Sequence, residues 1–385
     1  MEHPIAVLGG GIVGTAIAYT LSEQGIPCVL VERDLNPQGA TACSFASVSA
    51  MDEATTDLYL LKCRGMEAWR TWDKKLELGA AYRREGEIRW AESASGAAEL
   101  EFLVERARSR GYPVRTIGEG DLRARLVEAN PGRVLAASLA PEDAVVDPLA
   151  SLTAALDRFK LNGGRVIHGR AAIGFVNDGI ELVVHDERIP VSTAVVAAGA
   201  ETPVMFERLG WEIPMRPSPG LLVRTTPVKP LVHQIVYVTP EFGPPIHLRQ
   251  DDDGRVTLGE RSQEWIARNP SREHAEALLR QATNFWPALS DATVEHFMLE
   301  WRPMPADGLP IIGRAPGFSG LYVAAMHSGV TLAPAVGELV ARELIENTRV
   351  SPLAPFGLER FDVRELEIER DVDKIFEATP EMFLG

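Results

Sequence analysis

The amino-acid sequence predicts an α/β fold, in which helices cover a mostly parallel sheet and a second, antiparallel sheet is inserted. Residues 4–32 alternate a short apolar strand, a glycine turn, a helix and a second apolar strand, which is typical of parallel sheets. Residues 320–347 repeat the order of strand, turn and helix. Residues 216–262 are rich in Pro, Val, Thr and Gly, which favours an antiparallel sheet.

The order of the elements can be predicted along most of the chain. A buried strand over 193–198 closes on Gly199. Apolar residues at helical spacing predict helices over 53–79, 97–110, 119–128, 148–159 and 271–285, and from about residue 332. We expect a discontinuous nucleotide-binding domain from 1–75, 145–214 and 300–350, a substrate domain from 76–144 and 215–299, and a polar, acidic tail over 351–385.

The net charge limits the partners that the protein can have. The chain of 385 residues has 39 Lys and Arg against 54 Asp and Glu, a net charge of −15. Because so acidic a protein repels nucleic acid and anionic membrane surfaces, we expect neither as a partner. A substrate that carries a carboxylate would need a local positive site.

The cysteines indicate the cellular compartment. Cys28, Cys43 and Cys63 are odd in number and form no C-x-x-C pair, so a disulfide framework or a structural zinc is not expected. The first residues lead directly into a strand and lack the basic region and cleavage site of a signal peptide. No apolar run is long enough to span a bilayer. We therefore expect a cytoplasmic protein.

The first turn of the chain has the pattern G-x-G-x-x-G. Gly9 permits a tight turn, Gly11 lets the backbone approach a pyrophosphate, and Gly14 lets the helix pack close to the sheet. Glu32 ends the next strand and could accept hydrogen bonds from both hydroxyls of a ribose, whereas it would repel a 2′-phosphate. These features predict a Rossmann-like dinucleotide site, but they do not distinguish FAD from NAD.

Four separated stretches of the chain, taken together, match the sequence pattern of a known protein family. They are the glycine turn with Glu32-Arg33, the small-residue segment 40–47, the apolar strand 195–200, and the pair 301–313 and 327–334. The pair reads W-R-P-M-P-A-D-G-L-P-I-I-G and H-S-G-V-T-L-A-P. These stretches resemble the D-amino-acid oxidase superfamily of FAD-dependent oxidoreductases, and most of all its glycine oxidase and D-amino-acid dehydrogenase branches.

The resemblance implies that the cofactor is FAD, because an NAD dehydrogenase has no reason to carry the C-terminal pair. It implies a Rossmann-like FAD-binding domain in which the inserted antiparallel sheet of the substrate domain roofs the isoalloxazine. The branch of the family with covalent flavin uses a C-terminal Cys, so we expect non-covalent FAD. The residues that the resemblance assigns to FAD are Gly9, Gly11, Ile12, Val13, Gly14, Glu32, Arg33, Ala42, Cys43, Ser44, Ser47, Val48, Ala172, Ala198, Gly199, Met326, His327, Gly329, Val330 and Thr331.

The chain departs from the family pattern close to the expected site. Met326 stands where the family usually has Gly, Glu201-Thr202 replaces a common Trp-Ser, and Ser47-Val48 replaces the Asn-Ala of the dehydrogenase branch. These differences affect the identity of the substrate more than the fold or the cofactor.

Two residues of the C-terminal pair are candidates for catalysis. Arg302 matches the Arg that anchors the substrate carboxylate in the family, and a planar guanidinium suits two-point binding of a carboxylate. The alternative is a structural Arg paired with Glu300 or Asp307. His327 could hydrogen-bond the flavin or the substrate and could titrate near neutral pH, or it could only hold its turn. The helix after Gly329 should present its N-terminus to the reduced flavin.

The predicted roof adds three candidates. His247 and Arg249 alternate with apolar residues on a predicted strand, so both should face the same side of the sheet. Tyr237 lies on an earlier strand of the same region. We expect these residues to contact the substrate, with His247 as a further catalytic candidate, although a solvent-exposed sheet face would show the same pattern.

These observations predict an enzyme that oxidises a small amine or amino acid, with hydride transfer to flavin N5 and hydrolysis of the resulting imine. One alternative is an FAD-dependent oxidoreductase acting on a non-amine such as a 2-hydroxy acid. Another is a flavin-binding subunit without catalysis of its own. The electron acceptor could be O2 or a respiratory quinone, and the protein could form a homo-oligomer.

Overall fold

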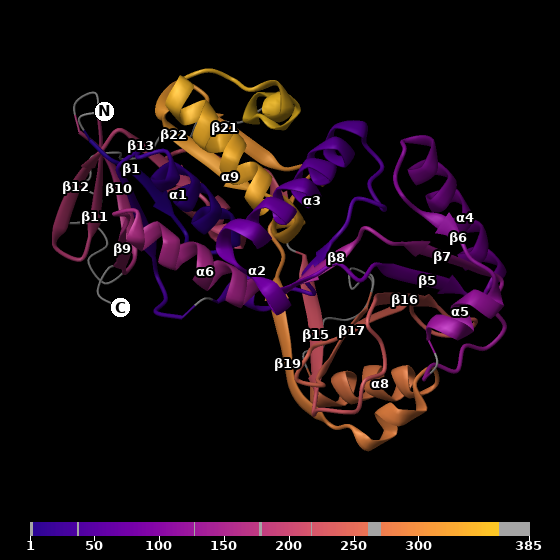
Figure 1. Ribbon diagram of the computed structural model, residues 1–385. Helices are drawn as coiled ribbons and strands as arrows, with labels where there is room; N and C mark the ends of the chain where they lie inside the picture. Colours follow the sequence, from indigo (N-terminus) through magenta and orange to yellow (C-terminus); the bar gives the residue numbers. More distant parts are fainter. Residues whose placement is uncertain are drawn as a thin grey trace.

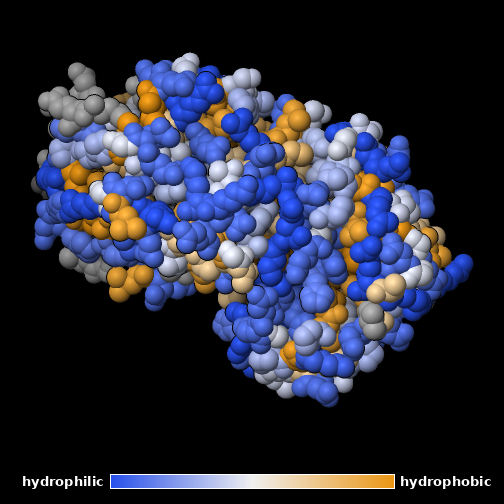
Figure 2. Space-filling view, viewed as in Figure 1, coloured by the Kyte–Doolittle hydropathy of each residue, from blue (hydrophilic) through white to orange (hydrophobic). Residues whose placement is uncertain are grey.

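The computed structural model describes residues 3–36, 38–126, 128–176, 179–216, 218–260 and 271–361. It has two lobes, each built around its own sheet (Figure 1). The predicted α/β architecture is therefore present. On the face shown in Figure 2, hydrophilic residues predominate and apolar residues form small, separated groups. No helix in the part of the chain that the structure describes combines the length and hydrophobicity of a membrane span.

The sheet of the first lobe has six strands in the order β21-β22-β13-β1-β2-β9. All neighbours are parallel except β21, which runs antiparallel to β22. The central strands are apolar runs buried on both faces, which is the condition that a covered parallel sheet requires. The strands are β1 (Ile5–Leu8), β2 (Cys28–Glu32), β9 (Arg165–His168), β13 (Thr193–Val196), β21 (Ile311–Ala315) and β22 (Phe318–Ala325).

Four long helices pack on this sheet or on one another, and the predicted helices 53–79 and 148–159 are two of them. They are α1 (Ile12–Glu23), α3 (Thr56–Leu76), α6 (Pro148–Leu161) and α9 (Gly329–Glu346) (Figure 1). Two glycines let them approach closely: a Cβ on Gly337 of α9 would lie 2.7 Å from the Ala16 carbonyl oxygen, and one on Gly65 of α3 would lie 2.2 Å from that of Thr331. Helix α9 is thereby fixed between α1 and α3.

The sheet of the second lobe has eight strands in the order β19-β15-β18-β17-β16-β5-β7-β6. It is antiparallel, as predicted, except that β16 runs parallel to β5. These two strands belong to different inserts of the chain, so no hairpin fixes their relative direction. The strands are β5 (Glu87–Ala91), β6 (Arg115–Thr116), β7 (Ala136–Ala140), β15 (Pro219–Thr225), β16 (Ile235–Thr239), β17 (Ile246–Gln250), β18 (Val256–Glu260) and β19 (Val294–Trp301).

The remaining elements complete the two lobes. The helices that accompany the second sheet are α4 (Ala94–Ser109), α5 (Glu119–Arg125) and α8 (Arg272–Thr283) (Figure 1). The small sheets are β3 (Ser47–Val48), β8 (Ala144–Val146) and β4 (Tyr82–Arg83); β10 (Ala171–Val176), β11 (Gly179–Val184) and β12 (Glu187–Val191); and β14 (Met215–Arg216) with β20 (Met304–Pro305). The remaining α-helices in the described residues are α2 (Gly39–Ala42) and α7 (Thr202–Glu207).

The limits of the two domains stay a prediction. Residues 351–361, the first part of the predicted polar tail, are described by the structure. Leu353, Phe356 and Leu358 are fully buried in the apolar cores of the first lobe. The first residues of the predicted tail are thus packed against the first lobe, and the three apolar side chains lie in two short 3-10 helices. Residues 362–385 lie outside the described residues.

Candidate active site

A cavity of about 1030 Å³ runs from the glycine turn to the sheet of the second lobe. Small-molecule pockets commonly have about 300–1,000 Å³, so this one has room for more than a substrate. Its wall includes the glycine turn, the end of β2, the loop 43–49, the start of α9 and the face of β15, β16 and β17. Segments from both lobes therefore share one cavity.

The glycine turn has no room for side chains at two of its positions. Gly9 has a φ of +109°, and a Cβ on it would lie 2.4 Å from the Ala197 carbonyl oxygen. A Cβ on Gly14 would lie 1.9 Å from the Gly9 carbonyl oxygen. Helix α1 therefore starts directly against the sheet, and Gly11, Ile12 and Val13 at its N-terminus line the cavity. A helix N-terminus in this position favours phosphate groups.

A hydroxyl completes this helix start. Thr41 Oγ1 accepts a hydrogen bond of 3.1 Å from the Ile12 backbone N–H, and Thr41 also lines the cavity. Sequence reasoning did not assign a role to Thr41, although it lies inside the small-residue segment 40–47. An isolated Thr in such a segment gives no signal of its own, because the contact joins residues 29 positions apart.

Glu32 lies at the end of β2 with its carboxylate fixed by the backbone. Oε2 accepts a hydrogen bond of 2.5 Å from the Gly10 N–H, and Oε1 accepts one of 2.9 Å from the Asp34 N–H. This places the carboxylate beside the glycine turn, where a ribose would follow a pyrophosphate. Arg33 lines the same region and pairs with Asp34 at 3.2 Å and Glu201 at 3.4 Å.

The start of α9 and the loop before β3 meet in the middle of the cavity. Thr331 Oγ1 donates to the Ser47 carbonyl oxygen at 3.0 Å, and Trp69 Nε1 donates to that of Val330 at 2.8 Å. Ser328, just before the helix, adopts a left-handed conformation with a φ of 59°. The backbone of residues 329–331 lines the cavity, so the positive end of the helix dipole lies at its wall.

The surroundings of His327 favour its neutral form. Burial, together with the nearby positive charges of Lys62, Arg302 and Arg216, lowers the pKa of His327 to about 3. Its Nδ1 lies 3.2 Å from Ser328 Oγ. This lowered pKa disfavours the titration near neutral pH that the sequence left open, because the site disfavours a further positive charge; His327 remains able to hydrogen-bond as a neutral imidazole.

Cys43 is an inert thiol in this environment. Burial, and to a lesser degree the charge of Glu300, raises the pKa of Cys43 to about 11. Its sulfur lies 3.2 Å from the Met298 sulfur. A protonated thiol is a poor nucleophile, which agrees with the expectation that this residue contacts the cofactor without reacting with it.

Arg302 lies at the cavity wall and is held by backbone carbonyl groups. Its Nη2 donates to the Pro219 oxygen at 3.1 Å and its Nε to the Ser218 oxygen at 3.4 Å. Gly220 lies beneath it, since a Cβ there would come within 3.6 Å of Arg302 Cδ. Asp307, one of the alternative partners, instead pairs with Arg360 at 2.8 Å. This ion pair gives Asp307 a structural partner of its own.

The predicted roof residues divide into two groups. Tyr237 and His247 are directly opposite each other on β16 and β17, and both line the cavity. Arg249 is not among the described residues that line it, and its guanidinium pairs with Asp251. Two residues along a strand correspond to about 6.6 Å. Arg249 lies behind the cavity wall, where its guanidinium is 6.0 Å from the centre of the Phe45 ring.

The residues predicted to contact FAD also fall into two groups, those that line the cavity and those that do not. Most of them line the cavity, but Gly14, Ala42, Val48 and Ala172 do not, within the described part of the chain. Gly14 acts through close packing instead. Ala172 is buried, and the preceding residues 169–171 line the cavity in its place. The predicted residues that line the cavity are Gly9, Gly11, Ile12, Val13, Glu32, Arg33, Cys43, Ser44, Ser47, Ala198, Gly199, Met326, His327, Gly329, Val330 and Thr331.

A buried charged group at the roof has no counterpart in the prediction. Arg89 of β5, with 6% of its surface exposed, pairs with Asp52 and with Glu87, each at 2.5 Å. Its guanidinium lies 4.5 Å from the centre of the Tyr237 ring. Lys62 pairs with Glu53 in the same wall of the cavity. No motif marks these residues, because strands and loops from distant parts of the chain bring them together.

The fold and the cavity define a dinucleotide-dependent oxidoreductase. The chain belongs to the family of FAD-dependent oxidoreductases named DAO, whose model matches residues 4–343. The predicted resemblance to the D-amino-acid oxidase superfamily and the predicted cofactor are thereby confirmed. The cavity fits FAD, since the glycine turn, Glu32 and the start of α9 lie along one continuous wall.

Individual relatives agree with this assignment. The chain is 26% identical to glycine oxidase of Bacillus subtilis over 91% of this chain and 95% of that protein. It is 27% identical to one of the proteins that make up opine oxidase of Rhizobium meliloti, over 95% of this chain and 100% of that protein. The structure of glycine oxidase from Geobacillus kaustophilus has a TM-score of 0.84 at 23% identity, covering 93% of this chain and 99% of that one. The predicted reaction class, oxidation of a small amine or amino acid, is confirmed.

Proposed function

We propose that this enzyme oxidises a small α-amino acid or N-alkyl amino acid whose carboxylate binds to Arg302. The observation that carries the proposal is the position of Arg302 in the same cavity as the dinucleotide turn, the start of α9 and the roof. Bound FAD supplies the chemistry by accepting a hydride from the carbon that bears the amine.

The protein residues have separate tasks in this scheme. The Ser218 and Pro219 carbonyl groups orient the Arg302 guanidinium, which can then hold both oxygens of a carboxylate. His327 offers a neutral imidazole for a hydrogen bond. Tyr237 and His247 cover the reacting carbon from the roof and exclude water from it. The amine must be uncharged when the hydride leaves, and low water access favours its neutral form.

The names of the relatives support an amine joined to a carboxylate. Glycine, iminodiacetate, L-proline and 4-methylaminobutanoate each combine the two groups, and they appear in the names of matching enzymes. Several of these compounds are secondary amines. We therefore include N-alkyl amino acids in the proposed substrate class.

The test is an anaerobic screen of flavin reduction. Purified holoenzyme is mixed with D- and L-amino acids, glycine, sarcosine and other secondary amines, and with 2-hydroxy acids as the competing class. Release of ammonia or alkylamine identifies oxidation of a C–N bond. Reduction by hydroxy acids alone would overturn the proposal, and a flavin that no compound reduces would favour a flavin-binding protein without catalysis of its own.

Substitution of Arg302 tests the anchor. We expect Arg302→Met to lower kcat/KM for carboxylate substrates by about 30-fold or more, since loss of a buried charged partner costs about 2–5 kcal/mol. Arg302→Lys should retain part of the activity because it keeps the charge but loses the two-point geometry. An unchanged apparent affinity in Arg302→Met would contradict the assignment.

Four finer properties complete the proposal. The cofactor is non-covalent, so acid precipitation should leave all of the FAD in the supernatant. The acceptor is O2 or a quinone, and stoichiometric H2O2 in air would identify O2. The three cysteines are free thiols, which supports a cytoplasmic location. Sedimentation of the holoenzyme would show whether it forms a homo-oligomer.

A further inference from the structure

One large side chain interrupts the small-residue segment 40–47. Phe45 is the only aromatic residue in this segment, and it lies on the loop between α2 and β3. Its ring is half-buried and lines the cavity. A large ring in a segment that passes through the active site must occupy space that a substrate could otherwise use.

The Phe45 ring contacts both roof residues. It meets the His247 ring edge to face, with 4.3 Å between ring centres, and the Tyr237 ring at 6.1 Å. The Tyr237 and His247 rings lie 5.2 Å apart. Such aromatic contacts fix relative positions as well as burying area. The three rings, which we call the roof cluster (Phe45, Tyr237 and His247), join the first lobe's loop to the second lobe's sheet.

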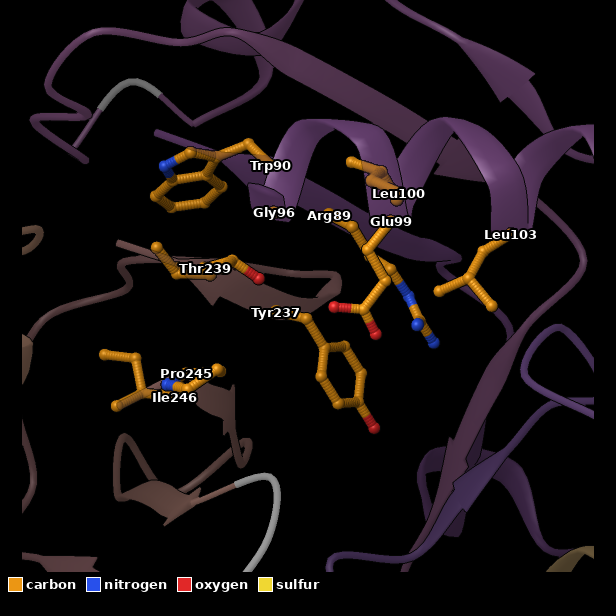
Figure 3. Close-up of a pocket in the computed structure, with 11 residues that line it drawn as sticks. Arg89, Trp90, Gly96, Glu99, Leu100, Leu103, Tyr237, Thr239, Pro245 and Ile246 are labelled. Carbon is orange, nitrogen blue, oxygen red and sulfur yellow. The ribbon is translucent and has the colours of Figure 1, made fainter. Parts of the chain in front are cut away.

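The sheet fixes two members of the roof cluster. His247 is opposite Tyr237, and Tyr237 is opposite Arg89, so the three form one row across neighbouring strands. Figure 3 shows Arg89 alongside Tyr237, next to the residues of α4. The row continues on the next strand with Gly259, which is opposite His247. A Cβ on Gly259 would lie 2.3 Å from His247 Nε2. The His247 ring thus fills the space above Gly259 and cannot move further that way.

The loop fixes the third member. Ala46, the next residue, has a left-handed backbone with a φ of 59°, and its N–H donates to Ser44 Oγ at 3.0 Å. The Val146 N–H donates to the Ala46 oxygen at 3.1 Å, and Thr331 Oγ1 donates to the Ser47 oxygen at 3.0 Å. These hydrogen bonds fix the backbone on the C-terminal side of Phe45, so a bulky ligand can displace the ring only by rotating the side chain against its contacts with the His247 and Tyr237 rings.

We propose that Phe45 is a specificity-determining residue, whose ring limits the size of the group attached to the amine or α-carbon of the substrate. The inference rests on the proposed function, because it assumes a substrate with Arg302 at one end and the roof cluster at the other. Phe45 contributes shape and no proton transfer. A phenyl ring held against the His247 and Tyr237 rings discriminates by steric overlap with larger ligands.

The experiment compares wild-type holoenzyme with Phe45→Ala and Phe45→Leu. The probes are glycine, N-methylglycine, N-ethylglycine and N-benzylglycine, assayed by anaerobic flavin reduction. In Phe45→Ala, the ratio of kcat/KM for the N-benzyl compound to that for glycine should rise by about tenfold or more, the discrimination that a hydrophobic pocket provides per small group. Phe45→Leu should lie between. Phe242→Ala, which removes a ring that is 82% exposed, is the matched control and should leave the ratio unchanged.

A binding measurement makes the test independent of turnover. Acetate and 3-phenylpropionate are titrated against each holoenzyme, and the visible spectrum of the bound FAD reports their affinity. Phe45→Ala should improve binding of 3-phenylpropionate relative to acetate, whereas Gly259→Ala, which pushes the His247 ring into the cavity, should weaken it. Unchanged ratios in both assays would overturn the role of Phe45. If the binding ratio shifts but no amine reduces the flavin, the proposed function fails and the inference survives.

Discussion

The nucleotide end of the cavity is made mainly by backbone, whereas the roof end is made by side chains. At the glycine turn, Gly9 and Gly14 leave no space for a Cβ, and two backbone N–H groups fix Glu32. At the roof, Tyr237, His247 and Arg89 meet through the register of neighbouring strands. The first kind of site depends on local conformation and the second on the pairing of distant segments, so the two ends should respond differently to substitution.

The largest effect is expected at Gly14. In Gly14→Ala the new Cβ would overlap the Gly9 carbonyl oxygen at 1.9 Å, so the turn must open and the helix must move away from the sheet. We expect the protein to lose bound FAD completely. The ratio of flavin absorbance to protein absorbance after purification measures this. Gly120→Ala is the control, because nothing lies within 4 Å of its Cβ, and it should retain the full amount of FAD.

The second largest effect is a loss of stability expected when Arg89 at the roof is replaced. Arg89→Met leaves Asp52 and Glu87 without their shared cation, and breaking a buried ion pair costs about 3–5 kcal/mol of stability. We expect a clear fall in the thermal midpoint while FAD still binds. Arg84→Met removes a surface Arg, which lies 3.6 Å from Glu142, and should cost no more than about 1 kcal/mol. If Arg89→Met lost FAD without losing stability, the proposed difference between the nucleotide end and the roof end of the cavity would be contradicted.

The smallest effect concerns pH. The pKa of His327 in the folded protein, about 3, lies below its ordinary value of 6.5, so the unfolded chain takes up a proton that the folded site refuses. Stability should therefore fall as the pH decreases from about 6.5 towards 3. His327→Gln should reduce this slope in thermal midpoints measured between pH 4 and 8. Equal slopes in the two proteins would show that the pKa of His327 in the folded protein is not depressed.

The nucleotide end of the cavity could be predicted from the sequence because the residues that form it lie close together in the chain. The spacing of Gly9, Gly11 and Gly14 and the position of Glu32 are visible within 24 residues. Alternation placed His247 and Arg249 on one face of their strand, and the family resemblance placed this sheet, with Tyr237, over the substrate. Neither could tell that Arg249 does not line the cavity. Alternation gives the face of a strand and not the position along it.

Sequence reasoning missed other residues of the site for a different reason, which is that their contacts join distant parts of the chain. Arg89 reaches Tyr237 through a strand pair that joins two inserts, and Asp52 reaches Arg89 from a loop. Phe45 is visible in the sequence, but its contact with His247 depends on how the two lobes meet. Such contacts follow from tertiary packing, which neither propensity nor a short motif records.

The parallel pair of β5 and β16 has a consequence for synthesis of the chain. Strand β5 ends at Ala91, but its partner begins only at Ile235. At ordinary translation rates this interval corresponds to a wait on the order of ten seconds, during which one edge of β5 has no native neighbour. An exposed strand edge can pair with other chains, so the emerging second lobe should depend on chaperones more than its final stability suggests.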